Sequence, residues 1–252
     1  MPSTADEVPG ARLTPPLFLV SALPDGDRAL LDGAEGRHAA RVRRLGVGER
    51  LDLGDGAGAV ARCVVAAVGA DELTLIVQDR SAVPAPEPAI IVVQALAKGD
   101  RGELAVELMT EAGADEIVPW AAGRSIARWR GEKSLQRWRS TAREAAKQSR
   151  RRWLPQVADL HDTPAVARLL AGADAAIVLH ESAAIALSAL SLPGTGRIAI
   201  VVGPEGGLTH EEVAAFTAAG AVTVRLGPEV LRTSTAGVVA VAALSPRLER
   251  WS

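Results

Sequence analysis

Two glycine-rich turns in the last fifth of the chain have residue types and spacing that suit ligand binding. The first turn is Gly203-Pro204-Glu205-Gly206-Gly207, and the second begins at Leu226-Gly227. Glycine has no side chain, so a ligand can lie directly against backbone N–H and C=O groups. Two such turns, one after each of two neighbouring strands, would form a wall of backbone polar groups. Such a wall suits a nucleoside-sized cofactor.

The elements that must position these turns alternate between strand and helix beyond residue 88. The apolar runs predict strands at 89–96, 115–118, 174–180, 197–202 and 222–226, and the helical patterns fall at 101–113, 133–149, 183–190, 209–219 and 233–249. This alternation predicts an α/β fold with a parallel sheet and helices on both faces.

The first third of the chain has a different pattern, of short alternating strands between Gly/Asp turns. Strands are expected at Leu17–Ala22, Arg50–Leu53, Ala59–Val68 and Glu72–Gln78. Prolines 84, 86 and 88 make the segment before the α/β part stiff and extended. The sequence therefore predicts a loose tail at 1–16, a small β domain at 17–80, a linker at 81–88 and an α/β domain at 89–252.

Composition narrows the class of protein. Of the 252 residues 48% are apolar, which is enough for a sizeable core. The single cysteine, Cys63, excludes a disulfide framework, and its place in an alternating run predicts a buried strand position. The four histidines are scattered, so we expect no metal site. No run approaches about 20 apolar residues and no signal peptide is visible, so we expect a cytoplasmic protein.

Charge is distributed unevenly along the chain. The net charge is −2, yet between Arg124 and Arg152 the chain has eleven basic residues and two acidic ones. Such an excess can gather phosphates. Trp129, Trp138 and Trp153 lie in or beside this basic run and could stack on unpaired bases. The alternative is a solvated helix face with the tryptophans turned inward.

Together the two turns resemble a known signature. The pair GPEGGLT and LGPEVLRTSTA is similar to the cofactor-binding signature of the SPOUT class of S-adenosylmethionine-dependent RNA methyltransferases. Within that class the chain most resembles the family that methylates uracil N3 in 16S rRNA. Lys98-Gly99-Asp100-Arg101, Leu179-His180-Glu181 and the helix through Arg143–Ser149 also match that family. The resemblance covers most of residues 89–244.

This resemblance implies a fold, a cofactor and partners. The fold is a SPOUT-type parallel sheet with a C-terminal trefoil knot, preceded by a small PUA-like β-barrel. The cofactor is S-adenosyl-L-methionine, the partners are 16S rRNA in the 30S ribosomal subunit and a second copy in a homodimer, and the family's target is uridine 1498. The implied cofactor-binding residues are Leu179, His180, Glu181, Gly203, Pro204, Glu205, Gly206, Gly207, Leu226, Gly227, Leu231, Arg232, Thr233, Thr235 and Ala236. Thr233 and Thr235 could instead merely cap the following helix.

Arginines and one lysine are the expected RNA contacts. They are Arg12, Arg41, Arg43, Arg44, Lys98, Arg101, Arg124, Arg143, Arg150, Arg151 and Arg152. The family opens its first strand with an arginine–aromatic pair, whereas here the nearest arginine is Arg12. After Ser149 the family has Gly-Arg, whereas here three arginines follow. These departures affect the RNA contacts and leave the cofactor signature intact.

Methylation of uracil N3 needs an electron-rich nitrogen. The N3 proton has a pKa of about nine, so it must leave before or during attack. A nearby cation would stabilise the resulting anion, and Arg232 is the candidate catalytic residue because it adjoins the cofactor turn. Its alternative role is pairing with Glu205 or with the C-terminus of a helix. Glu205 is a weak candidate for the base, since it could simply bind backbone N–H groups, and no other residue stands out as the base.

Two other functions fit part of the sequence. One is ribose 2′-O-methylation, another SPOUT activity. The second is a non-catalytic RNA-binding or ribosome-assembly factor that uses the β domain and the basic run alone and has no affinity for S-adenosylmethionine. A dinucleotide-binding dehydrogenase is disfavoured because no strand is followed by GxGxxG, and no Gly-Lys-Ser/Thr ending supports a P-loop kinase.

Overall fold

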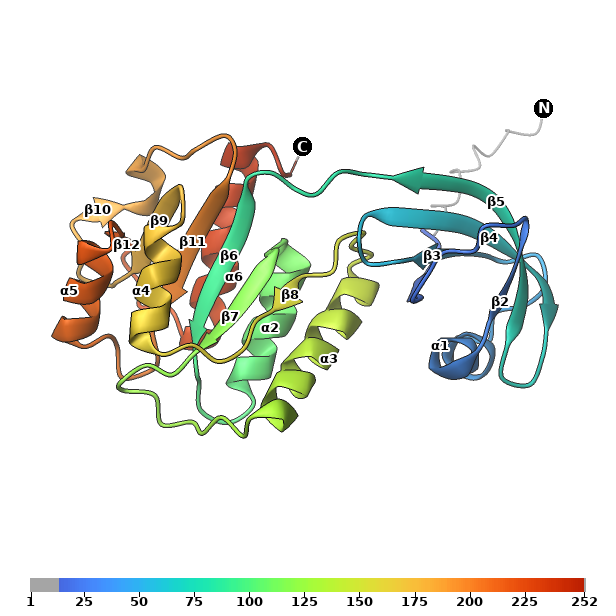
Figure 1. Ribbon diagram of the computed structural model, residues 1–252, viewed down its shortest axis with the longest axis horizontal. Helices are drawn as coiled ribbons and strands as arrows, with labels where there is room; N and C mark the ends of the chain where they lie inside the picture. Colours follow the sequence, from blue (N-terminus) through green and yellow to red (C-terminus); the bar gives the residue numbers. More distant parts are fainter. Residues whose placement is uncertain (1–13, 252) are drawn as a thin grey trace, which may run out of the picture. The chain divides into compact units, whose positions relative to one another are not determined.

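The computed structural model describes residues 14–251, which form two compact units (Figure 1). The N-terminal unit ends at Ala82, and the C-terminal unit comprises residues 56–58 and the chain from Val83 onward. The strand that ends at Ala82 takes up the first two residues of the expected linker. Arg12 and most of the expected tail lie outside the described residues.

The N-terminal unit is a curled five-stranded sheet in the order β1-β3-β4-β5-β2. Its strands are β1 (Leu17–Leu19), β2 (Arg28–Leu31), β3 (Arg50–Gly54), β4 (Ala59–Val68) and β5 (Leu73–Ala82), with helix α1 (Gly33–Arg37) and a π-helical turn (His38–Val42). Strand β2 was not expected from the sequence. Cys63 lies buried in β4, as predicted, and burial, with a smaller effect of Asp52, raises the pKa of its thiol to about 11.

The C-terminal unit is a seven-stranded parallel sheet in the order β10-β12-β9-β11-β6-β7-β8. Its strands are β6 (Ala89–Ala95), β7 (Glu116–Trp120), β8 (Gln156–Val157), β9 (Ala175–Leu179), β10 (Ile185–Ala186), β11 (Arg197–Val202) and β12 (Val222–Arg225). Its helices are α2 (Arg101–Ala112), α3 (Glu132–Gln148), α4 (Thr163–Ala171), α5 (His210–Ala218) and α6 (Thr233–Leu244). The predicted parallel α/β sheet is therefore confirmed.

Helices cover both faces of this sheet (Figure 1). Because side chains alternate along a strand, Ile90 and Val92 of β6 face the core under α2, α3 and α6, whereas Ile91 and Val93 face the core under α4 and α5. Strands buried on both faces read as continuous apolar runs, which is why β6 and β11 were recognisable from the sequence.

Three helix predictions were wrong or incomplete. The helix expected at 183–190 is instead strand β10, which pairs with β12, followed by a 3-10 turn (Leu187–Ala189). Helix α4 was missed, although Asp162 caps it and Pro164 opens it. Helix α6 ends at Leu244, ahead of a 3-10 turn (Ser245–Leu248) that contains a proline. No helix of the described residues is long and apolar enough to cross a membrane.

Candidate active site

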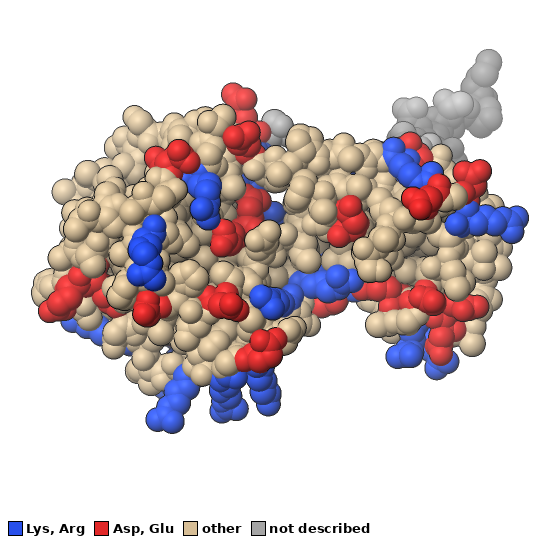
Figure 2. All heavy atoms as spheres, viewed as in Figure 1, with Lys and Arg blue, Asp and Glu red and all other residues tan. Residues whose placement is uncertain are grey.

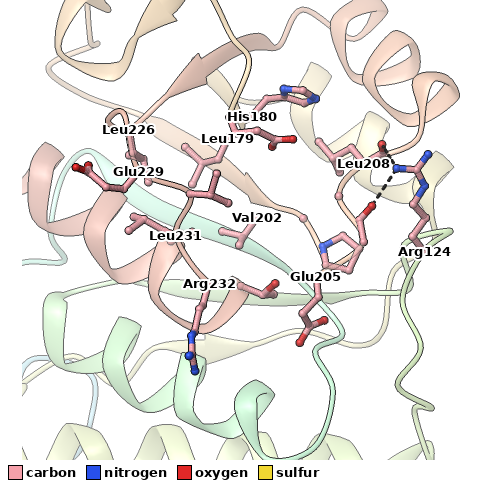
Figure 3. Close-up of a pocket in the computed structure, with 18 of the residues that line it drawn as sticks. Arg124, Leu179, His180, Val202, Glu205, Leu208, Leu226, Glu229, Leu231 and Arg232 are labelled. Carbon is pink, nitrogen blue, oxygen red and sulfur yellow. Dashed lines mark hydrogen bonds between the residues drawn. The ribbon is translucent and has the colours of Figure 1, made fainter.

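A cavity of about 600 Å³ lies at the carboxyl ends of β9, β11 and β12 (Figure 3). In an open parallel sheet this edge is where ligands bind, because loops rather than packed helices form it. Every predicted cofactor-binding residue except Thr235 lines this cavity. The Thr235 hydroxyl instead donates to the carbonyl of Arg232 at 3.2 Å, and no side chain of the described residues caps α6, so the capping alternative for Thr233 and Thr235 is wrong.

Seven further residues line the cavity without having been predicted to bind the cofactor. They are Arg101, Arg124, Val202, Leu208, His210, Glu229 and Val230. Five of them lie within or directly beside the two quoted motifs, so their position in the sequence could have identified them: Val202, Leu208, His210, Glu229 and Val230. Arg101 and Arg124 gave no such signal, because they come from other segments of the chain and reach the cavity through the fold.

The glycines of the first turn have different physical reasons to be glycine. Gly207 has a φ of +71°, which side chains rarely adopt. A Cβ at Gly206 would lie 3.1 Å from the Cβ of Arg124, so this glycine makes room for the protein's own arginine. A Cβ at Gly203 would lie 3.3 Å from the Cγ of Leu208. The turn is therefore required by local packing as well as by access to its backbone.

Glu205 is held by groups from another loop. Its Oε1 accepts the backbone N–H of Lys98 at 3.1 Å and the guanidinium of Arg101 at 3.4 Å. Burial alone would raise the pKa of this carboxyl, but backbone N–H groups and Arg101 together hold it below its usual range. Glu205 is thus a carboxylate that fastens the first turn to the segment before α2, which argues against the weak assignment as the base.

Arg232 is exposed at the edge of the cavity, directly before α6. Its predicted alternative partner, Glu205, is paired with Arg101, and no ion pair of Arg232 is found within residues 14–251. Figure 3 shows the Arg232 guanidinium and the Glu205 carboxylate both pointing away from the cluster of leucines. Arg232 is therefore an uncompensated cation at the mouth of the cavity.

The interior of the cavity combines an apolar wall with polar ends. Apolar side chains come from three segments of the chain (Figure 3), and they are those of Leu179, Val202, Leu226 and Leu231. His180, Glu181 and Glu229 add polar groups beside backbone turns. An apolar wall with a few convergent polar groups is typical of a small-molecule site.

The loop between β7 and α3 is anchored to the same cavity. Arg124 donates to the carbonyls of Gly206 at 2.9 Å and Leu208 at 3.2 Å. The buried Glu212 of α5 accepts the N–H of Gly123 at 2.7 Å while it completes a capping box with Thr209. These bonds fix the course of the loop beside the first glycine turn.

The structure contradicts the prediction that Arg151 contacts RNA. Arg151 is almost buried and pairs with Asp115 at 3.1 Å, and Arg250 pairs with the same carboxylate at 2.6 Å. Arg151 also donates to the carbonyls of Thr110 and Ala114. Its donors are directed into the protein, so it stabilises the fold and is not available to phosphates. A sequence could not reveal this, because Asp115 lies 36 positions away.

The tryptophans of the basic run also turn inward. Trp138 is 4% exposed and meets Trp129 edge to face at 5.4 Å between ring centres, and Trp129 packs against the core. The Trp153 indole N–H donates to the carbonyl of Val83. The prediction that Trp138 stacks on bases is wrong, and the alternative of inward-turned rings is correct for the Trp129–Trp138 pair.

The remaining predicted RNA contacts have varied environments. Arg41 pairs with Asp71 at 2.5 Å, while Arg43 and Arg44 are exposed. Lys98 and Arg150 are exposed as well. Arg143 and Arg152 are partly buried, and Arg101 and Arg124 line the cavity. RNA contact at these positions stays a prediction.

Comparison with known proteins gives consistent matches for both units. Residues 83–245 match the model of an RNA methyltransferase domain, and residues 31–78 match that of an RNA methyltransferase PUA domain. Curated relatives named ribosomal RNA small subunit methyltransferase E include one from Mycobacterium tuberculosis, 49% identical over 93% of each chain. One from Bacillus subtilis is 33% identical over 87% of this chain and 90% of the relative.

A solved structure gives the same match in three dimensions. It is a ribosomal RNA small subunit methyltransferase E from Neisseria gonorrhoeae bound to S-adenosyl methionine. The TM-score is 0.83 at 27% identity, over 93% of this chain and 98% of that one.

Proposed function

The chain belongs to the ribosomal RNA small subunit methyltransferase E family, and we propose that it methylates N3 of a uridine in 16S rRNA with S-adenosylmethionine as the methyl donor. The observation that carries this proposal is the cavity at the carboxyl edge of the parallel sheet. There, two glycine turns, an apolar wall and an unpaired arginine meet in one place.

The residues present fit S-adenosylmethionine. A volume of about 600 Å³ lies in the usual range for small-molecule sites. Leu179, Leu226 and Leu231 offer an apolar surface for the adenine, and the turns at 203–207 and 226–232 offer backbone donors and acceptors. Glu181 and Glu229 supply carboxylates for ribose hydroxyls or for the ammonium group. We assign the cofactor to this cavity.

Orientation is the main contribution of the turns. The bound cofactor supplies a methyl group that is electrophilic because it is attached to a sulfonium sulfur. The turns would hold the bound cofactor in one orientation, which would lower the entropic part of the barrier. Arg124 and Glu205 keep the first turn fixed through their contacts to Gly206 and to Lys98.

Arg232 stabilises the uracil anion. Loss of the N3 proton places negative charge on N3 and on O2 and O4, and a cation at the cavity mouth lowers the energy of that state. Arg232 is free for this role because Arg101 already neutralises Glu205. Glu205 remains ionised through its N–H and guanidinium donors, so its low basicity does not suit it to remove a proton of pKa about nine.

Several further properties belong to the proposal. The substrate is 16S rRNA in the 30S subunit, the N-terminal unit helps to hold the RNA, and the enzyme works as a homodimer in the cytoplasm. The trefoil knot implied by the SPOUT resemblance belongs to it as well. Membership of the family supports each of these properties.

The experiment is product analysis. Unmodified 30S subunits are incubated with the protein and S-adenosylmethionine, and the nucleosides of the 16S rRNA are separated by mass spectrometry. The proposal predicts 3-methyluridine. A 2′-O-methylated nucleoside would assign the chain to ribose methylation. Binding of 30S subunits with no methyl transfer and no cofactor affinity would favour the RNA-binding factor.

A further inference from the structure

The segment from Ser125 to Arg130 runs away from the cavity with its side chains alternating inward and outward. Ser125, Ala127 and Trp129 are partly buried, whereas Ile126, Arg128 and Arg130 are exposed. Ala127 and Trp129 pack against the core, and the Trp129 ring rests on Trp138. This inward packing fixes which residues face solvent.

The outward residues are cations with no partner in the protein. Within residues 14–251 no hydrogen bond or ion pair of the Arg128, Arg130 and Lys133 side chains is found, in contrast to Arg137, which pairs with Glu103 at 2.8 Å. Figure 2 shows basic side chains gathered on the surface over this loop and the start of α3. We call Arg128, Arg130 and Lys133 the basic rim.

The basic rim is continuous with the cavity. Arg124 lines the cavity and binds the first glycine turn, and the rim begins four residues further along the chain. Between them the Ile126 side chain is 78% exposed, so it offers an apolar surface beside the rim. A polymer whose one residue enters the cavity would have its neighbouring residues over this surface.

We propose that the basic rim and Ile126 bind the single-stranded RNA that flanks the target nucleotide. The rim cations bind phosphates, and Ile126 contacts the apolar face of a neighbouring base or ribose. This inference rests on the proposed function and adds to it the path of the RNA on the C-terminal unit. RNA fits better than an acidic protein because the charges adjoin a nucleoside-sized cavity.

The test compares two double variants of equal charge. Arg128→Ala with Arg130→Ala removes two rim cations, and Arg168→Ala with Arg197→Ala removes two exposed arginines elsewhere in the same unit. Binding of a single-stranded 16S rRNA fragment is measured over a range of salt. Each lost phosphate contact lowers the salt slope by about 0.7, so the rim variant loses about 1.4 and binds roughly ten-fold more weakly at 0.15 M salt.

Four additional measurements exclude a general defect. The rim variant should bind S-adenosylmethionine as the wild type does, and Arg128→Lys with Arg130→Lys should restore the salt slope. Ile126→Ser should weaken RNA binding and leave the slope unchanged, because it removes no charge. With 30S subunits, KM should rise in the rim variant while kcat is kept.

The outcomes separate the two proposals. Equal RNA affinity and equal slopes in the rim and control variants would overturn the basic rim, whatever the activity of the wild type. A wild type that binds RNA through the rim but transfers no methyl group would contradict the proposed function and leave the rim in place.

Discussion

The cavity and the basic run differ in how far their sequence determines their role. The cavity is made by two short contiguous motifs whose turns bring nearly all of their residues to one place. In the basic run, neighbouring cations have opposite surroundings, since Arg150 is exposed and Arg151 is almost buried in an ion pair. Backbone geometry is local and can be read from a motif, whereas the fate of a charged side chain depends on partners that are distant in the sequence.

The largest expected effect is at the cavity mouth. Arg232→Ala should lower kcat by about 100- to 1,000-fold, as loss of one group that stabilises a developing anion does. Affinity for S-adenosylmethionine, measured by calorimetry, should stay within a few-fold of the wild type because the turns hold the cofactor. Arg232→Lys should keep part of the rate. Wild-type turnover in Arg232→Ala would remove the assigned role.

Within the basic run, the largest expected effect on stability comes from breaking the ion pair between Arg151 and Asp115. Asp115→Ala leaves Arg151 and Arg250 without their shared carboxylate, and loss of one partner of a buried pair costs about 3–5 kcal/mol. Denaturant unfolding measures the change. The control is Glu103→Ala, which removes the partner of the exposed Arg137 and should cost less than about 1 kcal/mol. Equal losses would mean that Arg151 is not a structural residue.

Some parts of the fold and of the cavity could be predicted from the sequence, and others could not. Strands Ala59–Val68 and Arg197–Val202 were placed at their observed bounds, because their apolar patterns are strong. Strand β10 is two residues long and is defined by its pairing with β12, so no local pattern could reveal it. The Glu205–Arg101 pair likewise arises from a contact between segments about 100 residues apart.

A substitution in the first glycine turn tests the local geometry of the cavity. Gly207→Ala places a side chain at a φ of +71° and should cost about 1–2 kcal/mol in unfolding free energy. It should also weaken S-adenosylmethionine binding, because relaxation of the strain displaces the turn. Gly220→Ala, at a φ of +93° in a turn away from the cavity, is the control for strain alone. Equal cofactor affinity in both variants would argue against a cofactor role for the turn.

In the basic run the reverse substitution, of a residue with a positive φ by glycine, can be made at Arg150. Arg150 has a φ of +56°, where the resembling family has glycine, and among residues 14–251 its side chain has no partner. Arg150→Gly should therefore raise the unfolding free energy by about 0.5–1 kcal/mol, which thermal unfolding detects. A loss of stability would show that this side chain supports the fold as Arg151 does.

The smallest expected effect is the pH dependence of the unfolding free energy that Glu205 causes. Its pKa is depressed in the folded state, so its contribution to stability is present above the unfolded pKa of about 4.3 and disappears as the pH falls through the folded value. The wild type should thus be slightly more stable than Glu205→Gln at neutral pH. The difference should vanish in acid. A difference that persists in acid would show that the carboxylate charge does not hold the turn.

The central claim is that the cavity between the two glycine turns is the site of S-adenosylmethionine. Calorimetric titration of the purified protein with this cofactor, without RNA, tests it most directly. We expect micromolar binding at one site per chain, with affinity retained in Arg232→Ala and reduced in Gly207→Ala. Absence of binding, both alone and with 30S subunits present, would contradict it.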